Sequence, residues 1–303
     1  MKPTATFLLL ALLATAVPAR ADSPAIPSAQ RAAHDKLKDL EASFGGRIGV
    51  YALNTADGEQ IQYRADTLFP VQSTMKFIAA AALFDWSSRN KTSLQEKVRY
   101  GKDDLVDWHP VTGSRLGEGM TLEDLAAAAV THSDNPATNL ITRRIGGPDA
   151  VTRYARSIGN MSLRVDSWEP HMNSNPDVAR DVATPKDMAL SAKTLLLDGR
   201  LQQGPRTSLL GWMKDSTTGA RKMRAGAALG WTVADKTGGG GDFGVANDVG
   251  ILWSPACKPI VLAIYTVQGK QAAKPRDDVV ATATSLVMES FKVRNPCFGA
   301  TFH

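Results

Sequence analysis

The sequence predicts a mixed α/β protein of the α+β type, in which one antiparallel five-stranded sheet is flanked by helices. Two observations lead to this fold class. Strand-like runs occur near both ends of the 303-residue chain, whereas the long middle section is dominated by helical signals. A sheet built from both termini, with an all-helical sub-domain inserted between its two halves, accounts for that order.

The chain is expected to be exported. Residues 1–21 combine Lys2, an apolar run over 7–17 and the small-x-small sequence Ala19-Arg20-Ala21, a pattern typical of a cleaved signal peptide. We expect cleavage after Ala21 and a periplasmic or secreted protein. No later segment approaches the ~20 apolar residues that a membrane-spanning helix needs, so we expect no membrane association after cleavage.

Two sub-domains are expected in the mature chain. Residues 22–66 and 213–303 form the α/β sub-domain, residues 67–212 form the helical sub-domain, and the active site lies at their interface. The formal charge is +5, without a run of like charge or a basic stripe interleaved with aromatic residues. We therefore expect no nucleic-acid partner, and a local basic pocket for an anionic small molecule remains compatible with this charge.

The first expected elements are a helix and a hairpin. Apolar residues over 28–44 recur at helical spacing and stop at a glycine pair. Residues 47–54 then alternate apolar and polar, a turn follows at 55–58, and residues 60–64 return as the second strand. A helix is expected after Pro70, continuing to about Trp86.

Helical signals and then strand signals follow. Thr121 has the position of an N-cap, and Thr184-Pro185 opens another helix, because proline is tolerated in the first turn. An irregular loop is expected over 161–180. The remaining strands and the closing helix are expected at 231–235, 246–253, 259–267 and 277–291.

The two cysteines are expected to form a disulfide. Cys257 precedes a predicted strand and Cys297 follows the closing helix, so both sulfurs meet at one end if the helix runs back antiparallel over the strand. An oxidising compartment, as export implies, favours this bond over two free thiols.

Candidate chemistry begins at Ser73 and Lys76, which stand three residues apart where an apolar helix is expected to begin. Positions i and i+3 share a helix face, so a lysine of lowered pKa can take the serine proton. Spacing alone proves little, because Ser88 and Lys91 repeat it in a polar segment that is typical of a solvated helix end.

Three further short motifs distinguish Ser73. They are Ser133-Asp134-Asn135 at the exit of a helix, Glu169 with Asn173 in the irregular loop, and Lys236-Thr237-Gly238 at the end of a strand-like run. Each motif is weak evidence by itself. Together, in this order, they resemble the penicillin-recognising serine enzymes, and most closely the class A β-lactamases, over nearly the whole mature chain.

Opening a β-lactam amide requires a nucleophile, a base, an acid for the departing nitrogen and donors for the oxyanion. We assign Ser73 as nucleophile, Lys76 as proton acceptor or relay, and Ser133 as proton donor to the ring nitrogen. The backbone N–H groups of Ser73 and Gly239 are the expected oxyanion donors. Glu169, assisted by Asn173, is expected to deprotonate the water that hydrolyses the acyl-enzyme. Whether Glu169 or Lys76 is the base for acylation stays open.

The remaining site residues are expected to hold the substrate or the loop. Lys236 and Thr237 are expected to meet the substrate carboxylate. The resemblance implies that Asn135 contacts the side-chain amide of the substrate and that Asn139 fixes the Glu169 loop. The resemblance further implies Trp108 as an aromatic wall, with a stacked core tryptophan as the alternative, and Asp181 as an anchor of the loop. It also implies an additional cation, for which Arg276 is chosen over Lys222 and Arg224, with a solvated surface charge as the alternative.

The sequence departs from the family pattern at the loop. Relatives often carry an arginine before the Trp-Glu pair that ties the loop to an aspartate, whereas this chain has Ser167 with Asp181. The loop also looks one residue short. We therefore expect a mobile loop that tolerates bulky cephalosporin side chains. Gln72 and Gly240 stand where class A carbapenemases carry a cysteine pair, so carbapenem hydrolysis is not supported.

Two rival functions share the motifs. A D-alanyl-D-alanine peptidase typically lacks the Glu169 loop, and a β-lactam-sensing domain needs a membrane anchor that this chain does not show. We expect neither a metal ion nor a cofactor, and the resemblance implies a monomer. A zinc-dependent enzyme is excluded because the five histidines form no paired ligand motif: His34, His109, His132, His171 and His303.

Overall fold

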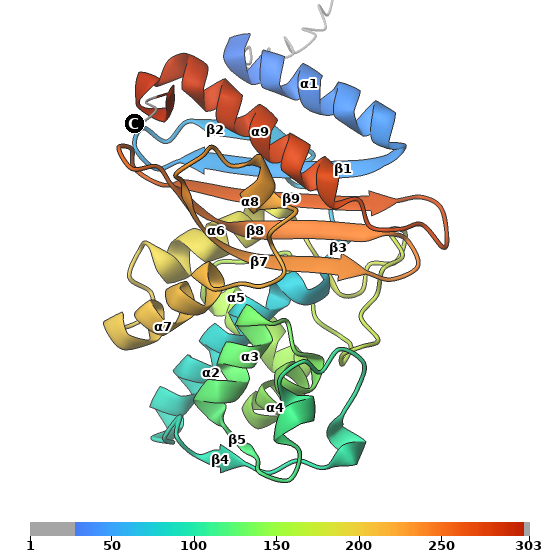
Figure 1. Ribbon diagram of the computed structural model, residues 1–303, viewed down its shortest axis with the longest axis vertical. Helices are drawn as coiled ribbons and strands as arrows, with labels where there is room; N and C mark the ends of the chain where they lie inside the picture. The colour runs from blue at the N-terminus through green and yellow to red at the C-terminus, as the bar shows by residue number, and fades with distance from the viewer. Residues whose placement is uncertain (1–27, 300–303) are drawn as a thin grey trace, which may run out of the picture.

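The computed structural model describes residues 28–299, and the expected signal peptide over 1–21 lies outside the described residues. A five-stranded antiparallel sheet in the order β2-β1-β9-β8-β7 forms its centre (Figure 1). The predicted fold class is therefore confirmed. The strands of this sheet are β1 Gly46–Asn54, β2 Gln60–Tyr63, β7 Thr232–Gly240, β8 Val245–Trp253 and β9 Ile260–Gln268.

The described part of the chain contains nine α-helices. Two short strand pairs, β3 Phe69–Pro70 with β6 Val182–Ala183 and β4 Lys97–Val98 with β5 Met120–Thr121, fasten the connecting segments. The helices are α1 Ser28–Phe44, α2 Lys76–Asn90, α3 Leu122–Thr131, α4 Asn135–Ile145, α5 Pro148–Ser157, α6 Pro185–Leu196, α7 Gln203–Lys214, α8 Met223–Gly226 and α9 Asp277–Arg294.

The sheet joins the two ends of the chain. β1 pairs with β9 over its whole length, so that Val50 lies opposite Ile264. Alternate residues of a strand face opposite sides, and the sequence obeys this rule on β1. Ile48 and Val50 belong to the core under α1 and α9, whereas Tyr51 belongs to the core on the opposite face.

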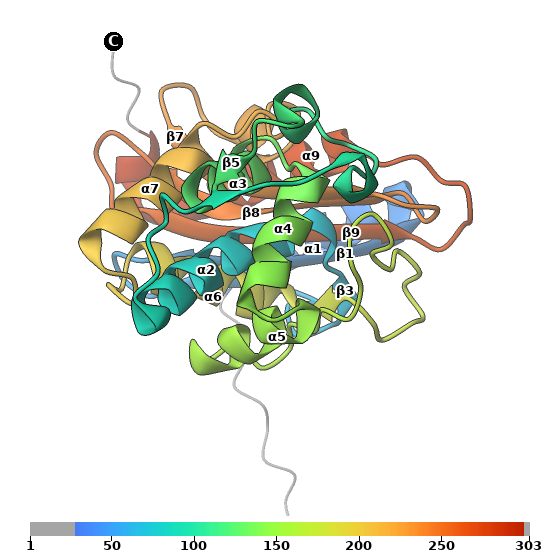
Figure 2. The same cartoon turned by 90° about the horizontal axis from the view of Figure 1, so that it is seen from below.

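The helical part lies beyond the β7 edge of the sheet. Figures 1 and 2 show α2, α3 and α4 on this side, and α7 packs against β7. The centre of this part is the alanine-rich helix α2, whose residues from Lys76 to Phe84 are all buried. Small side chains allow neighbouring helices to approach α2 closely, which fixes the Ser73 segment against the sheet edge.

The predicted helix start at Ser73 is corrected by one turn. A 3-10 helix covers Gln72–Met75, and the α-helix begins at Lys76. Gln72 has φ 49°, which is unusual for a residue with a side chain, and its Nε2 donates to the Asn173 carbonyl at 2.7 Å. The loop contact therefore holds a strained backbone just before the serine.

The predicted cap at Thr121 and the predicted helix start at Thr184-Pro185 are confirmed, and one cap was missed. Thr121 accepts from Asp124 N, and Thr184 accepts from Asp187 N. The Ser133 motif was expected to lead into a loop. Instead, α4 begins immediately at Asn135. Asp134 is the N-cap of α4, accepting from Ala137 N, and it also binds the Val111 and Thr112 N–H groups.

The strand that carries Lys236 is longer than predicted. β7 continues through the expected strand end at Asp235 to Gly240, because its pairing with β8 extends from Thr232 to Gly240. Lys236 and Thr237 therefore lie in the strand. β7 is also the edge strand of the sheet, so alternate backbone groups face away from β8, toward the 3-10 turn at Gln72–Met75.

The predicted disulfide joins Cys257 and Cys297, whose Cα atoms are 5.8 Å apart. The expected antiparallel approach of the closing helix to the strand is thus confirmed. Within residues 28–299, no helix combines the length and the apolar character that a membrane crossing requires.

Candidate active site

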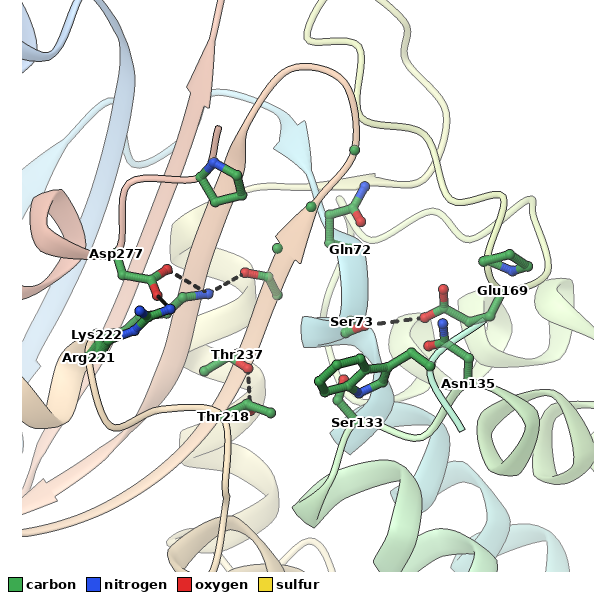
Figure 3. Close-up of a pocket in the computed structure, with 17 residues that line it drawn as sticks. Gln72, Ser73, Ser133, Asn135, Glu169, Thr218, Arg221, Lys222, Thr237 and Asp277 are labelled. Carbon is green, nitrogen blue, oxygen red and sulfur yellow. Dashed lines mark hydrogen bonds and ion pairs between the residues drawn. The ribbon is translucent and has the colours of Figure 1, made fainter. Parts of the chain in front are cut away.

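A pocket of about 450 Å³ opens at the β7 edge of the sheet. Figure 3 shows its two sides: Ser73, Ser133, Asn135 and Glu169 face Thr237 and Lys222 across the opening. The volume suits a small molecule. Its lining is Gln72, Ser73, Trp108, Ser133, Asn135, Glu169, Pro170, Thr218, Arg221, Lys222, Thr237, Gly238, Gly239, Gly240, Gly241, Pro275 and Asp277.

One carboxylate oxygen links the serine to the first lysine. Glu169 Oε1 lies 3.3 Å from Ser73 Oγ and 2.9 Å from Lys76 Nζ. In the described part of the chain, Ser73 and Lys76 share no direct hydrogen bond, contrary to the direct reach expected from their spacing. The 3-10 turn at Ser73 directs the hydroxyl toward the loop carboxylate instead.

Lys76 is fully buried at the start of α2. Its ammonium donates to the Ser133 carbonyl at 2.9 Å and to Asn135 Oδ1 at 2.5 Å, besides its contact with Glu169. Burial lowers the pKa of Lys76, and the Glu169 carboxylate opposes this shift. The pKa of this lysine is thus moved toward the range in which it can exchange a proton near neutral pH.

Ser133 stands between two lysines. Its Oγ is 3.1 Å from Lys236 Nζ and 3.4 Å from Lys76 Nζ, and its backbone has φ 58°. A hydroxyl that accepts hydrogen bonds from two ammonium groups keeps its own proton free to donate. Because Ser133 lines the pocket, that proton can be donated to a bound molecule. This left-handed residue is followed directly by Asp134, the N-cap of α4.

The backbone of Glu169 is fixed by one side chain. Asn139 Nδ2 donates to the Glu169 carbonyl at 2.9 Å, and Asn139 Oδ1 accepts from the Glu169 N–H at 3.0 Å. Glu169 itself is only 7% exposed. The two hydrogen bonds attach the loop to α4, so the carboxylate stays directed at Ser73 and Lys76.

The base of the loop is closed by Asp181, the residue expected to anchor it. Asp181 Oδ1 accepts from the Asp166 and Ser167 N–H groups, and Oδ2 accepts from Ser167 Oγ at 2.7 Å and from the Asn173 N–H at 3.1 Å. The tie that relatives make with an arginine is therefore present through the Ser167 hydroxyl. The expected mobility of the loop stays a prediction.

The opposite wall is formed by the Lys-Thr-Gly strand. Thr237 Oγ1 lies 2.6 Å from Thr218 Oγ1, and both residues line the pocket. Lys236 lies behind this wall, fully buried, and donates to Ser133 Oγ and to the Thr237 carbonyl. Burial, together with the positive charge of Lys76, lowers the pKa of Lys236 to about 7.

A second cation reaches the pocket beside this strand. Lys222 Nζ donates to the Gly238 carbonyl at 2.8 Å and lies 3.7 Å from Asp277, which also pairs with Arg221 at 3.2 Å (Figure 3). Burial lowers the pKa of Lys222, and the neighbouring aspartates oppose the shift. A Cβ on Gly239 would lie 3.3 Å from this ammonium, so glycine leaves room for it.

Glycine at position 238 allows the strand to approach the nucleophile segment. A Cβ there would lie 3.1 Å from the Val71 carbonyl and 3.2 Å from Gln72 Cβ. β7 therefore packs directly against the 3-10 turn. The Ser73 N–H is among the first donors of that turn, which have no partner inside the helix.

Of three residues expected to contact the substrate, one lines the pocket and two lie outside its lining. Trp108 lies at the pocket mouth, 59% exposed, with its Nε1 bound to the His132 carbonyl. Arg276 is outside the pocket lining and pairs with the exposed Asp278, whereas Lys222 lines the pocket. Asn173 is also outside the lining.

The Asn173 side chain is occupied by its own loop. Its Nδ2 lies within hydrogen-bonding distance of the carbonyls of Asn175, Val178 and Arg180, and its Oδ1 accepts from the Asn175 N–H. The expected help to a water at Glu169 is thus not visible in this arrangement. The amide satisfies carbonyl groups of an irregular loop that has few backbone partners.

Sequence reasoning missed Thr218, Arg221, Pro275 and Asp277, which line the pocket. None of them belongs to a short motif, and they come from the turn after α7, the approach to α8 and the start of α9. The hydroxyl run Ser216-Thr217-Thr218 is the one signal that could have drawn attention to this wall. Among residues 28–299, no three metal-ligating side chains form a group that could hold a metal ion.

The fold and the site define a class of protein. An edge strand carrying Lys-Thr-Gly, a buried Ser-x-x-Lys turn and a Ser-Asp-Asn cap meet in one pocket, as in the penicillin-recognising serine enzymes. The model of the β-lactamase enzyme family matches residues 32–291. The chain belongs to this family, and the predicted class A resemblance is confirmed.

Named relatives extend over nearly the whole chain. The β-lactamase OXY-2 of Klebsiella oxytoca is 44% identical, covering 92% of this chain and 97% of its own length. The β-lactamase Toho-1 of Escherichia coli is 40% identical, covering 93% of this chain and 97% of its own. The crystal structure of a β-lactamase from Desulfarculus baarsii DSM 2075 superposes with a TM-score of 0.84 at 42% identity, covering 86% and 98% of the two chains.

Proposed function

We propose that this protein hydrolyses the β-lactam amide of penicillins and cephalosporins through an acyl-enzyme on Ser73, and that it confers resistance to these antibiotics. The observation that carries the proposal is the buried Glu169 carboxylate, 3.3 Å from Ser73 Oγ and 2.9 Å from Lys76 Nζ. A peptidase or a sensor forms the acyl-enzyme with a β-lactam but releases it slowly or not at all. A hydrolase also needs a base beside the ester, and Glu169 fills that position.

Acylation is assigned to four side chains. Ser73 Oγ attacks the lactam carbonyl, and its proton passes to the Lys76 and Glu169 pair. Ser133, in contact with both lysines, returns a proton to the departing ring nitrogen. The Ser73 and Gly239 N–H groups receive the developing oxyanion, which the free donors of the 3-10 turn and of an edge strand support.

Deacylation is assigned to Glu169. A water held by this carboxylate loses its proton to Glu169 and attacks the ester carbonyl, which releases Ser73 and the opened product. Asn139 and Asp181 act as positioning residues, because they fix the backbone on both sides of Glu169. We propose no direct part for the Asn173 side chain, because it is bound to the loop itself.

Substrate recognition is assigned to both walls. Thr237 donates to the substrate carboxylate, and the charges of Lys236 and Lys222 stabilise that anion from behind and beside the strand. On the other wall, the resemblance assigns Asn135 to the side-chain amide of the substrate, and Trp108 covers it at the mouth. Asn135 Nδ2 donates to the Asp107 carbonyl, which fixes the orientation of the amide.

Export, assembly and organisation complete the proposal. We propose a periplasmic or secreted monomer, released by cleavage after Ala21. The division into residues 22–66 with 213–303 and residues 67–212 is kept, because both parts contribute residues to the pocket lining.

Mass spectrometry of the purified protein mixed with benzylpenicillin tests the proposal. We expect an adduct on Ser73 that clears within seconds while penicilloate accumulates. Ser73→Ala is expected to abolish both adduct and product, whereas the matched control Ser88→Ala, in the second Ser-x-x-Lys sequence, should behave as wild type. An adduct that persists for hours indicates a peptidase or a sensor, and the absence of an adduct contradicts the serine mechanism.

A further inference from the structure

The turn after α7 places a second hydroxyl against the Lys-Thr-Gly strand. Thr218 Oγ1 lies 2.6 Å from Thr237 Oγ1 (Figure 3). Ser216 Oγ lies 3.4 Å from Thr218 Oγ1 on the other side. The three hydroxyls form a chain that begins at the buried Ser216 and ends in the pocket. No short motif includes Thr218.

Each of the three hydroxyls has a single proton, and this restricts the direction in which their hydrogen bonds can run. Each hydroxyl has one proton to donate and can accept others. An ionised carboxylate can only accept hydrogen bonds, so the Thr237 hydroxyl must donate its hydrogen bond to the substrate carboxylate when the substrate binds. The short contact between Thr237 and Thr218 then needs the Thr218 proton, because two oxygens at 2.6 Å without a proton between them repel each other.

The backbone around Thr218 is held on two sides. The N–H and the hydroxyl of Thr217 both donate to the Thr131 carbonyl at the end of α3, at 2.9 and 3.2 Å. On the other side, a side chain at Gly219 would collide with the buried Asp235 carboxylate, so Gly219 packs directly on β7. The Thr218 hydroxyl is therefore presented by a segment with little freedom to move.

We propose that Thr218 is a positioning residue for substrate binding: its hydroxyl donates to Thr237 Oγ1 and thereby commits the Thr237 proton to the substrate carboxylate. The proposal rests on the proposed function, in which Thr237 meets that carboxylate. Hydrogen bonds in a chain polarise one another, so donation from Thr218 strengthens donation by Thr237. The contact is made equally in the ground state and the transition state, so it acts on KM rather than on kcat.

Steady-state kinetics with benzylpenicillin test this role in five variants. Thr218→Val is expected to raise KM roughly 5-fold, and Thr237→Val roughly 10-fold or more, with kcat within about two-fold of wild type in both. Thr218→Ser keeps the hydroxyl and is expected to restore the wild-type KM. The double variant is expected to match Thr237→Val alone, because the two residues act as one unit. Thr284→Val, which removes a buried hydroxyl bound within α9, serves as the matched control.

The outcomes separate the two proposals. If Thr237→Val raises KM and Thr218→Val leaves it unchanged or lowers it, the positioning role is overturned and the proposed function stands. If Thr237→Val leaves KM unchanged, the carboxylate assignment and the positioning role both fall. A Thr218→Ser variant as weak as Thr218→Val indicates a packing role and also overturns the inference.

Discussion

Lys76 and Glu169 form an ion pair of 2.9 Å in which the lysine is fully buried and the glutamate side chain is 6% exposed. Removing one partner of such a pair leaves an uncompensated charge, so both groups are tied to each other energetically. The shared oxygen, Glu169 Oε1, is also the atom nearest the serine hydroxyl. One proton can therefore move among serine, glutamate and lysine without a change in net charge.

Replacing Glu169 by alanine is expected to trap the acyl-enzyme. Ser73 and Ser133 remain in place, but the base that activates the hydrolytic water is lost. We expect this loss to lower the deacylation rate roughly 10²- to 10⁴-fold. Mass spectrometry is expected to show a penicilloyl adduct on Ser73 that persists for minutes or longer. Glu96→Ala, which removes a surface glutamate paired with Arg144, is the matched control and should clear the adduct as wild type does. Unchanged turnover in Glu169→Ala would overturn the assigned role.

The sequence predicted those parts of the site that depend on local chemistry. Thr121 and Thr184 cap helices because a hydroxyl before a helical run accepts a backbone N–H wherever it occurs. The Ser133 motif was recognised by its letters, yet the capping role of Asp134 was missed because α4 follows without a loop. Helix caps depend only on residues that are close together in the sequence, so they can be predicted from one sequence.

The rest of the site depends on contacts between distant segments. Arg276 was preferred over Lys222, but α9 turns Arg276 toward Asp278, and Lys222 is drawn inward by the Gly238 carbonyl. Thr218 lies next to Thr237 only because α7 ends beside β7. Spacing along the chain does not encode such pairings, which the tertiary packing decides.

The pH dependence of binding is expected to follow Lys236. Its pKa is about 7, so the ammonium that stabilises the substrate carboxylate is lost as pH rises through this value. The quantity kcat/KM reports the free enzyme and is expected to decline above about pH 7, whereas bound substrate raises the lysine pKa and moves the decline in kcat to higher pH. Profiles of both quantities with benzylpenicillin test the sign.

The matched variant for this profile is Lys236→Arg. A guanidinium stays protonated across the measured range, so the alkaline decline in kcat/KM is expected to move to higher pH. A decline at the same pH in wild type and in Lys236→Arg would assign the titration to another group. Lys76 is the nearest candidate, because it lies on the other side of Ser133 Oγ.

Loop mobility is tested at Ser167. The hydroxyl already binds Asp181, but an arginine there would replace a neutral donor with a charge-assisted pair, which is roughly twice as strong. Ser167→Arg is expected to slow hydrogen exchange over residues 162–181 and to lower ceftazidime turnover relative to benzylpenicillin. Ser43→Arg, at an exposed serine of α1, is the control. Comparable or better ceftazidime turnover in Ser167→Arg removes the idea that loop mobility admits bulky side chains.

The disulfide is expected to support stability without affecting catalysis. Cys257 and Cys297 are 40 positions apart in the chain, and a crosslink of this span lowers the entropy of the unfolded state by an amount worth about 4 kcal/mol. Cys257 follows the end of β8 that is remote from the Gly238 pairing, so the pocket is distant. Urea unfolding of the Cys257→Ser, Cys297→Ser double variant is expected to show a lower midpoint, with kcat/KM for benzylpenicillin within about two-fold of wild type. Each single variant should lose the same stability, because either one breaks the bond. An unchanged midpoint in all three variants contradicts the stabilising role, and a large loss of kcat/KM at full folding contradicts the separation from the site.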